Sequence, residues 1–148
     1  MPYLSGGSIG IGIAIWFLNH VSDQQLFKEE FDSILNLSKI RCTISGGLFD
    51  GAGGFLLLPS LVEDRQAQLD YTKDVIELAH LFLIEKEDTY IYPGNFSYRL
   101  SDDVFSGSSG IILAFQSIMK ENPLYWLPLI NVENFVASTR GSRLKEVH

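Results

Sequence analysis

Four side chains in this sequence have the chemistry to move a proton or attack an electrophile. Asp50 stands directly before a glycine-x-x-glycine step, where a carboxylate at the start of a helix could act as a base. His20 and His80 carry imidazoles, which titrate closest to neutral pH. Cys42, the single cysteine, is a potential thiol nucleophile. We take Asp50 and His20 as the candidate catalytic residues.

Each of these side chains also has a structural interpretation, which the sequence favours. Aspartate is a preferred N-cap and is stabilised by the helix dipole, so Asp50 is expected to cap a helix. A free cysteine is among the most buried residue types, so Cys42 is expected to pack in the interior. His20 closes an apolar helix, where a cation is favourable, and His80 lies within an amphipathic one.

Three further polar residues lie just before the third glycine step. Arg99, Asp102 and Asp103 are placed where they could contact a bound peptide. The alternative is a solvated loop in which Asp102 or Asp103 caps the following helix. We keep all three as candidate substrate-binding residues.

A glycine-x-x-glycine step occurs three times, and each copy opens an apolar stretch. The first glycines are 44 and then 56 residues apart, which indicates an internal repeat. Glycine at a helix start permits close approach of a neighbouring helix or a ligand. A unit of this kind buries its apolar face by stacking on copies of itself. The six glycines expected to be structural are Gly7, Gly10, Gly51, Gly54, Gly107 and Gly110.

The stretch after each step predicts an inner helix. Residues 8–21 are apolar nearly all round, so that helix is expected to be buried on every side. The second inner helix follows Gly54 and is expected to be bent or shortened by Pro59. The third is expected over residues 108–120.

Amphipathic outer helices are expected after the first two inner helices. Ser22 and Asp23 are expected N-caps for the first, whose apolar positions begin at Phe27. The second, of about five turns, is expected after a polar connection at residues 63–68. Its expected apolar positions are Leu69, Val75, Ile76, Ala79, Phe82 and Leu83.

The remaining segments predict little regular structure. Residues 89–92 and 96–100 flank Pro93-Gly94-Asn95, which indicates a short hairpin or an irregular loop. Residues 123–130 suit a packed extended tail, and residues 131–148 a frayed end.

Composition excludes several classes of protein. The net charge of −7 and the scattered Lys and Arg residues argue against nucleic-acid binding. A hydrophobic content of 46% fits a packed core. Residues 9–18 are too few to cross a bilayer, and a lone cysteine favours a reducing, cytoplasmic setting. The first step begins close to Met1, so we expect part of something longer.

Residues 3–10, 47–54 and 104–114 resemble the repeat signature of lanthionine synthetase C-like (LanC-like) cyclase domains. Residues 92–95 and 99–103, followed by Trp126-Leu127-Pro128, are similar to the C-terminal end of the cyclase domain in class III, three-domain synthetases. The likeness extends from Pro2 to about Ile130.

The resemblance implies an all-α fold, a partial α/α toroid in which inner helices form one ring and outer helices a second. A full domain of this family has more than three repeats, so residues 1–130 are expected to form an open arc. The remainder of the synthetase, or a second chain, would complete the ring. Exposed inner-helix surface is expected to promote association.

The family joins a peptide cysteine thiol to a dehydroamino acid, which closes a thioether ring. Its metal-dependent members activate that thiol with a zinc ion held by two cysteines and one histidine. Asp50 stands where such members place a ligand histidine, and one cysteine cannot complete the set. The resemblance to class III domains, which also lack zinc ligands, therefore implies no metal or other cofactor.

Two functions follow from the resemblance. The first is thioether formation on a dehydrated precursor peptide, with Asp50 or a histidine as base. The second is a non-catalytic module that binds the peptide or assembles with other chains. A phosphate site at the glycine steps is disfavoured because no Gly-Lys-Ser/Thr follows. A carbohydrate-active α/α barrel also remains open, although no carboxylate pair is evident.

Overall fold

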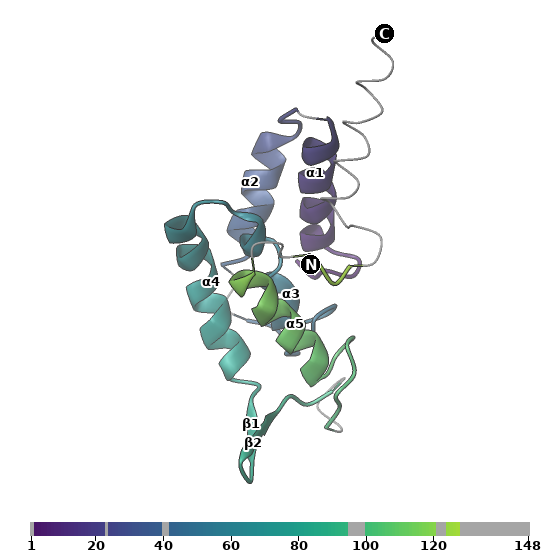
Figure 1. Ribbon diagram of the computed structural model, residues 1–148, viewed down its shortest axis with the longest axis vertical. Coiled ribbons are helices and arrows are strands. Elements are labelled where there is room, and N and C mark those ends of the chain that lie inside the picture. The colour runs from purple at the N-terminus through teal and green to yellow at the C-terminus, as the bar shows by residue number, and fades with distance from the viewer. Residues whose placement is uncertain (1, 23, 40–41, 95–99, 121–123, 128–148) are drawn as a thin grey trace.

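The computed structural model is mostly helical with one small two-stranded sheet (Figure 1). It describes residues 2–22, 24–39, 42–94, 100–120 and 124–127. The helices α1 and α2 lie side by side, and α3 contacts both α4 and α5. The elements are α1 Ser8–Ser22, α2 Lys28–Leu37, α3 Ala52–Phe55, the 3-10 helix η1 Pro59–Leu61, α4 Arg65–His80, β1 Ile84–Lys86, β2 Thr89–Ile91 and α5 Ser108–Met119. None of the helices in these ranges combines the length and apolar character needed to cross a membrane.

The helix predicted at residues 8–21 is confirmed as α1, but it is not buried on every side as predicted. Ile9 and Ile13 lie in the core, whereas Ile11 is 59% exposed. The helix is apolar around its whole circumference, yet it packs mainly against α2, so part of its apolar surface stays in solvent.

The start of α2 differs from the prediction. Ser22 ends α1, and its hydroxyl donates to the carbonyl of Leu18 at 2.7 Å. Asp23 lies outside the described residues. The residue before α2 is Phe27, which has a positive φ of 54° and is exposed instead of facing the core. Ser22 is therefore not an N-cap, since its hydroxyl bonds back into the preceding helix.

Pro59 shortens the second inner helix, as predicted. The helix α3 has four residues, a turn follows it, and Pro59 then opens η1. Every residue from Gly51 to Leu61 is buried, so this segment forms the centre of the hydrophobic core.

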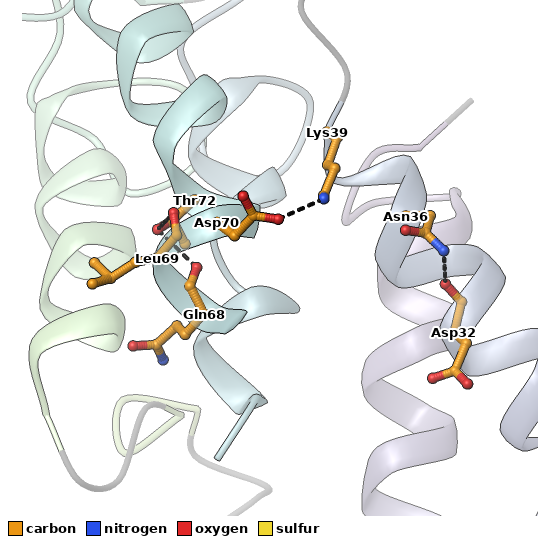
Figure 2. A network of polar contacts seen from close by, with 7 residues as sticks. All are labelled: Asp32, Asn36, Lys39, Gln68, Leu69, Asp70 and Thr72. Carbon is orange, nitrogen blue, oxygen red and sulfur yellow. Dashed lines mark hydrogen bonds and ion pairs between the residues drawn. The ribbon is translucent and has the colours of Figure 1, made fainter. Parts of the chain in front are cut away.

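The helix α4 begins earlier than predicted, within the expected connection at residues 63–68. Asp64 caps it by accepting a hydrogen bond from the amide of Gln66 at 2.9 Å. The buried face of α4 also differs from the predicted one. Leu69 and Ile76, which were expected to be buried, are exposed, while Gln68 and Thr72 are buried. The two polar side chains are hydrogen-bonded locally, as Figure 2 shows for the Thr72 hydroxyl and the Gln68 carbonyl.

Polar contacts fasten α4 to its neighbours. Arg65 donates to the side chain of Gln68 and, at 2.9 Å, to the carbonyl of Ile118 at the end of α5. On the other side, the ammonium of Lys39 lies 2.8 Å from a carboxylate oxygen of Asp70 (Figure 2). The hydrogen bond to Asp70 raises the pKa of Lys39, but an exposed pair of this kind contributes little stability.

The first stretch of the predicted hairpin contains a strand, β2, and this strand has a partner, β1, that was not predicted. The strand β2 pairs antiparallel with β1, with Glu85 opposite Tyr90. Glu87 in the connecting turn has a positive φ of 54°. Of the expected second stretch, residues 96–99 lie outside the described residues, and Leu100 forms a single antiparallel bridge with Pro93.

The third inner helix is confirmed as α5. Leu124, Tyr125 and Trp126 then form a turn, not the predicted extended tail. The indole of Trp126 donates to the hydroxyl of Ser117 at 2.9 Å and Leu124 is buried, so the turn folds back onto α5. Residues 131–148, predicted to be frayed, lie outside the described residues.

The three glycine steps share one backbone geometry. We call the segments that contain them unit 1 (residues 3–22), unit 2 (residues 45–61) and unit 3 (residues 101–119). A side chain at the second glycine of each step would lie closer than 3.0 Å to the carbonyl oxygen six residues earlier. Only glycine therefore fits without moving backbone. The glycine and carbonyl pairs are Gly10 with Leu4, Gly54 with Leu48, and Gly110 with Val104.

Equivalent residues of successive units are also hydrogen-bonded to one another. The amide of Ser5 in unit 1 donates to the carbonyl of Phe49 in unit 2 at 2.9 Å. The amide of Phe49 donates in turn to the carbonyl of Phe105 in unit 3 at 3.2 Å. All three residues stand two positions before the first glycine of their step. The units are therefore joined in series by one repeated backbone contact, which we call the inter-unit ladder.

We expect Gly54→Ala to destabilise the protein by about 1–3 kcal/mol, as overpacking does elsewhere. The added methyl would lie 2.5 Å from the carbonyl oxygen of Leu48, and a backbone atom cannot yield locally. Gly12→Ala is the matched control, because its methyl would meet the movable side-chain ends of Leu58 and Ile34. The free energy of unfolding from urea titrations checks both variants. Equal losses in the two variants would contradict a backbone constraint at Gly54.

Candidate functional site

The turns before α1, α3 and α5 place equivalent residues in a row, and we call the surface along this row the seam. The position directly before the first glycine is Gly6 in unit 1, Asp50 in unit 2 and Ser106 in unit 3. Gly6 has a positive φ of 65°, which glycine adopts most easily. Because the inter-unit ladder runs through the neighbouring residues, the turns lie next to one another. Asp50 is thus the carboxylate of the middle turn.

Asp50 does not cap α3 as predicted. The N-cap residue is Gly51, and the Oδ1 atom of Asp50 is buried with no hydrogen-bond partner among the described residues. That oxygen lies 2.8 Å from the point where a side chain on Gly47 would begin. The residue as a whole is half-buried. The turn therefore holds a carboxylate with one buried oxygen that has no hydrogen-bond partner, and Gly47 leaves the space for that oxygen.

Unit 3 contains a satisfied carboxylate in the corresponding turn. Asp103 accepts hydrogen bonds from the Ser101 hydroxyl at 2.5 Å and from the Ser106 amide at 2.8 Å. The Ser101 hydroxyl, followed by the Ser106 amide, lowers the pKa of Asp103 to about 2. Asp103 therefore fixes the turn before α5, in a charged form over the whole physiological range.

The predicted group of Arg99, Asp102 and Asp103 is placed only in part. The N-cap of α5 is Gly107, so neither aspartate is the helix cap that the alternative interpretation expected. Asp102 is exposed beside the seam, and Arg99 lies outside the described residues.

His20 lies near the end of α5, whereas Asp50 lies near its start. His20 is exposed at the end of α1, its ring centroid is 4.4 Å from that of Trp16, and it borders a hollow of about 470 Å³. Residues 118–120 at the end of α5 line the same hollow, whereas Asp50 lies near Ser106 before α5 begins. A helix of 12 residues separates the two ends by roughly 17 Å. His20 and Asp50 therefore do not form one site.

The remaining sequence candidates lie apart from the seam. His80 is exposed and is the last residue of α4. Cys42 is exposed, so the prediction of a packed cysteine was wrong. It belongs to the irregular segment between α2 and α3, which the apolar periodicity of the helices does not cover. Within the described ranges, no three His, Cys, Asp or Glu side chains gather as a metal site would need.

Two features of the site had not been predicted. The rings of Phe49 and Phe105 stack at 4.9 Å across the seam between units 2 and 3. The sequence signal for this contact was that Phe49 and Phe105 occupy equivalent positions of the repeat. The hollow near His20 also contains Arg65 and Gln68, which no spacing in the sequence related to His20.

Comparison with known proteins finds a similarity at low sequence identity. No model of a protein family matches the chain. It is 25% identical over 126 residues to the probable SapB synthase of Streptomyces coelicolor (strain ATCC BAA-471 / A3(2) / M145). The aligned region covers 83% of this chain and 13% of that protein. The chain is therefore similar to a short part of a much longer synthase.

We expect Asp103→Asn to reduce the pH dependence of stability in acid. Because the pKa of Asp103 is lower in the folded protein than its usual 3.8, its contribution is present above pH 3.8 and is lost as pH falls to about 2. The variant is thus expected to be less stable than the wild type at neutral pH and to approach it near pH 2. Urea midpoints at several pH values measure this.

Asp102→Asn is the matched control, because it removes the neighbouring exposed carboxylate. It is expected to keep the wild-type change in stability between pH 4 and pH 2. A wild-type slope in Asp103→Asn would show that its hydrogen bonds do not stabilise the fold.

Proposed function

We propose that this chain is part of a lanthionine-synthetase-type protein that modifies peptides, and that residues 1–130 form part of its cyclase domain. In this proposal the three units are consecutive segments of an α/α toroid, with α1, α3 and α5 in the inner ring. The similarity to the probable SapB synthase, together with the resemblance of the glycine steps to LanC-like domains, supports the family. Because the chain spans a small part of that relative, other segments would complete the ring.

The repeated contact between units carries the proposal. The inter-unit ladder joins Ser5 to Phe49 and Phe49 to Phe105 with the same donor and acceptor positions. The second glycine of one unit also packs on the equivalent leucine of the unit before it, Gly54 on Leu4 and Gly110 on Leu48. A ring of such units needs the same contact between successive members, so the repeated contact supports the proposal.

The proposed chemistry centres on Asp50. Its carboxylate accepts the proton of a peptide cysteine thiol, and the thiolate sulfur bonds to the β-carbon of a dehydroalanine. The electron pair of the carbon–carbon double bond moves to the α-carbon, which then takes up a proton. The reaction needs no oxidant or reductant. We assign the proton to the second oxygen of this half-buried carboxylate, because Oδ1 is buried and a bound peptide does not reach it.

The seam offers contacts for the peptide beside Asp50. Phe105 is 49% exposed and stacked on Phe49, so the pair presents an aromatic surface. Asp102 is exposed next to it, while Asp103 is occupied by Ser101 and Ser106. Arg99 completes the proposed peptide-binding group. These contacts would hold thiol and dehydroamino acid close together, which supplies much of the rate enhancement in such additions.

A second candidate function is a non-catalytic peptide-binding or assembly module. The separation of Asp50 from His20 favours it, because the two candidate bases cannot cooperate. In this alternative the chemistry resides in other parts of the synthetase, and the chain contributes its surface alone.

We expect Asp50→Asn to lower the rate of thioether formation by about 10²-fold or more, as loss of a general base does. The substrate is a peptide with one cysteine and one dehydroalanine, incubated with the chain together with the rest of the synthetase. Loss of free thiol, followed by mass spectrometry after alkylation, measures the rate. Fluorescence anisotropy of the labelled peptide measures binding, which the substitution is expected to leave nearly unchanged.

Glu77→Gln is the control for the loss of one negative charge, because Glu77 is exposed on α4 outside the seam, and we expect it to retain at least half of the rate. Thiol loss no faster than in buffer, with and without the remaining synthetase, would reject catalysis by this chain. Peptide binding without thiol loss would then support the non-catalytic module.

A further inference from the structure

The hollow beside His20 is a second concave site, at the other end of α5 from the seam. Its volume of about 470 Å³ is within the range of ligand pockets. All three units contribute to it, through Trp16 of unit 1, Leu61 of unit 2 and Ile118 of unit 3. The hollow is therefore enclosed by contacts within the chain.

A buried hydrogen-bond network fixes Arg65 at the edge of this hollow. The side chain of Gln68, which is only 6% exposed, accepts from Arg65 and donates to the carbonyl of Ser60 at 3.2 Å. Arg65 also donates to the carbonyl of Ile118 at 2.9 Å. Both contacts of Arg65 use Nη1, and no acceptor among the described residues bonds to Nε or Nη2. The guanidinium is thus held in place while part of its donor fork stays available.

The charges around the hollow favour an anion. Arg65 and Lys120 are cations and Glu63 is an acid, so the described lining has a surplus of one positive charge, although the whole chain carries −7. The ammonium of Lys120 lies 3.8 Å from the centroid of the Tyr125 ring. No carboxylate of the described residues forms an ion pair with Arg65. Arg65 is therefore the cation placed for direct contact with a ligand.

Apolar side chains form much of the remaining lining. Leu61 and Ile118 are buried at its floor, and Met119 is 79% exposed at its edge. Burial of an apolar group against this surface is favourable, so the fitting anion has an apolar group beside it. One surplus positive charge matches a carboxylate better than a phosphate monoester, which carries about −1.5 to −2 at neutral pH.

We propose that the hollow binds a peptide carboxylate, with Arg65 donating two parallel hydrogen bonds to its oxygens. An apolar side chain next to that carboxylate packs against Leu61 and Ile118. The carboxylate belongs either to the C-terminus of the peptide or to an acidic side chain within it. The hollow is separated from Asp50 by the length of α5, so this contact is additional to those at the seam and does not depend on thioether chemistry.

The direct test titrates the purified chain with short N-acetylated peptides by isothermal titration calorimetry. The first probe is a tripeptide that ends in leucine with a free carboxylate, and the second is its C-terminal amide. The free acid is expected to bind at least about tenfold more tightly, because paired hydrogen bonds from arginine to a carboxylate are strong. A third probe, an amide with glutamate beside leucine, shows whether an acidic side chain supplies the carboxylate instead.

Arg65→Gln is expected to weaken binding of the free acid at least about tenfold and to leave binding of the amide nearly unchanged. An arginine that only supported the fold would affect both probes equally, so the difference isolates the direct contact. Lys73→Gln is the matched control, because Lys73 is exposed on the same helix and does not line the hollow. It is expected to bind both probes like the wild type.

Met119→Glu is a second variant that leaves the network around Arg65 intact. Met119 is 79% exposed, so the substitution is expected to be tolerated by the fold. The added negative charge at the edge of the hollow is expected to weaken binding of the free acid about tenfold, and binding of the amide much less. Circular dichroism and the urea midpoint establish that each variant is folded.

Several results would overturn the proposal. They are the absence of binding by all three peptides, equal affinity for the free acid and its amide, and unchanged binding of the free acid by folded Arg65→Gln and Met119→Glu. Stronger displacement of the free acid by inorganic phosphate than by acetate at equal concentration would overturn the assignment to a carboxylate. Since these measurements record binding without thiol loss, they fail independently of the proposed role of Asp50.

Discussion

The close approach of backbone to backbone at the second glycine of each step is the constraint on which this structure depends. A methyl group on Gly54 would lie 2.5 Å from the carbonyl oxygen of Leu48, so the turn and the helix can cross only where no side chain intervenes. The crossing holds each turn so that Phe49 can donate to Phe105 in the next unit and accept from Ser5 in the previous one. The local geometry of a step therefore determines how units join.

The middle unit shows how contacts between units bury apolar residues. With neighbours on both sides, unit 2 buries every residue from Gly51 to Leu61. Units 1 and 3 also contain apolar helices, but within the described residues each contacts unit 2 alone, and Ile11 or Ile112 is exposed. Apolar surface of this kind is normally covered in a stable assembly. The burial of an inner helix is thus set by the neighbours of its unit and not by its own composition.

Sequence reasoning succeeded where the constraint is local and failed where it depends on packing. The glycine steps, the shortening at Pro59 and the extents of α1 and α5 follow from backbone sterics and apolar runs. The buried face of α4 could not be predicted, because Gln68 is buried through hydrogen bonds to Ser60 and Arg65. The exposed Cys42 lies in a segment that no periodicity describes. Among the candidate site residues, the buried oxygen of Asp50 without a hydrogen-bond partner could not be predicted, because it depends on the packing of its turn.

Asp50 and Asp103 are carboxylates in equivalent turns, and they differ in their hydrogen bonds. In unit 3 the carboxylate at position 103 accepts from Ser101 and Ser106, so it holds its own turn together. In unit 2 that position is Gly47, and the carboxylate has moved to position 50, where one oxygen is buried without a donor. An unsatisfied buried acceptor costs about 1–3 kcal/mol. Unit 3 satisfies its carboxylate within the same kind of turn, so packing of the turn alone does not account for the unpaired oxygen of Asp50.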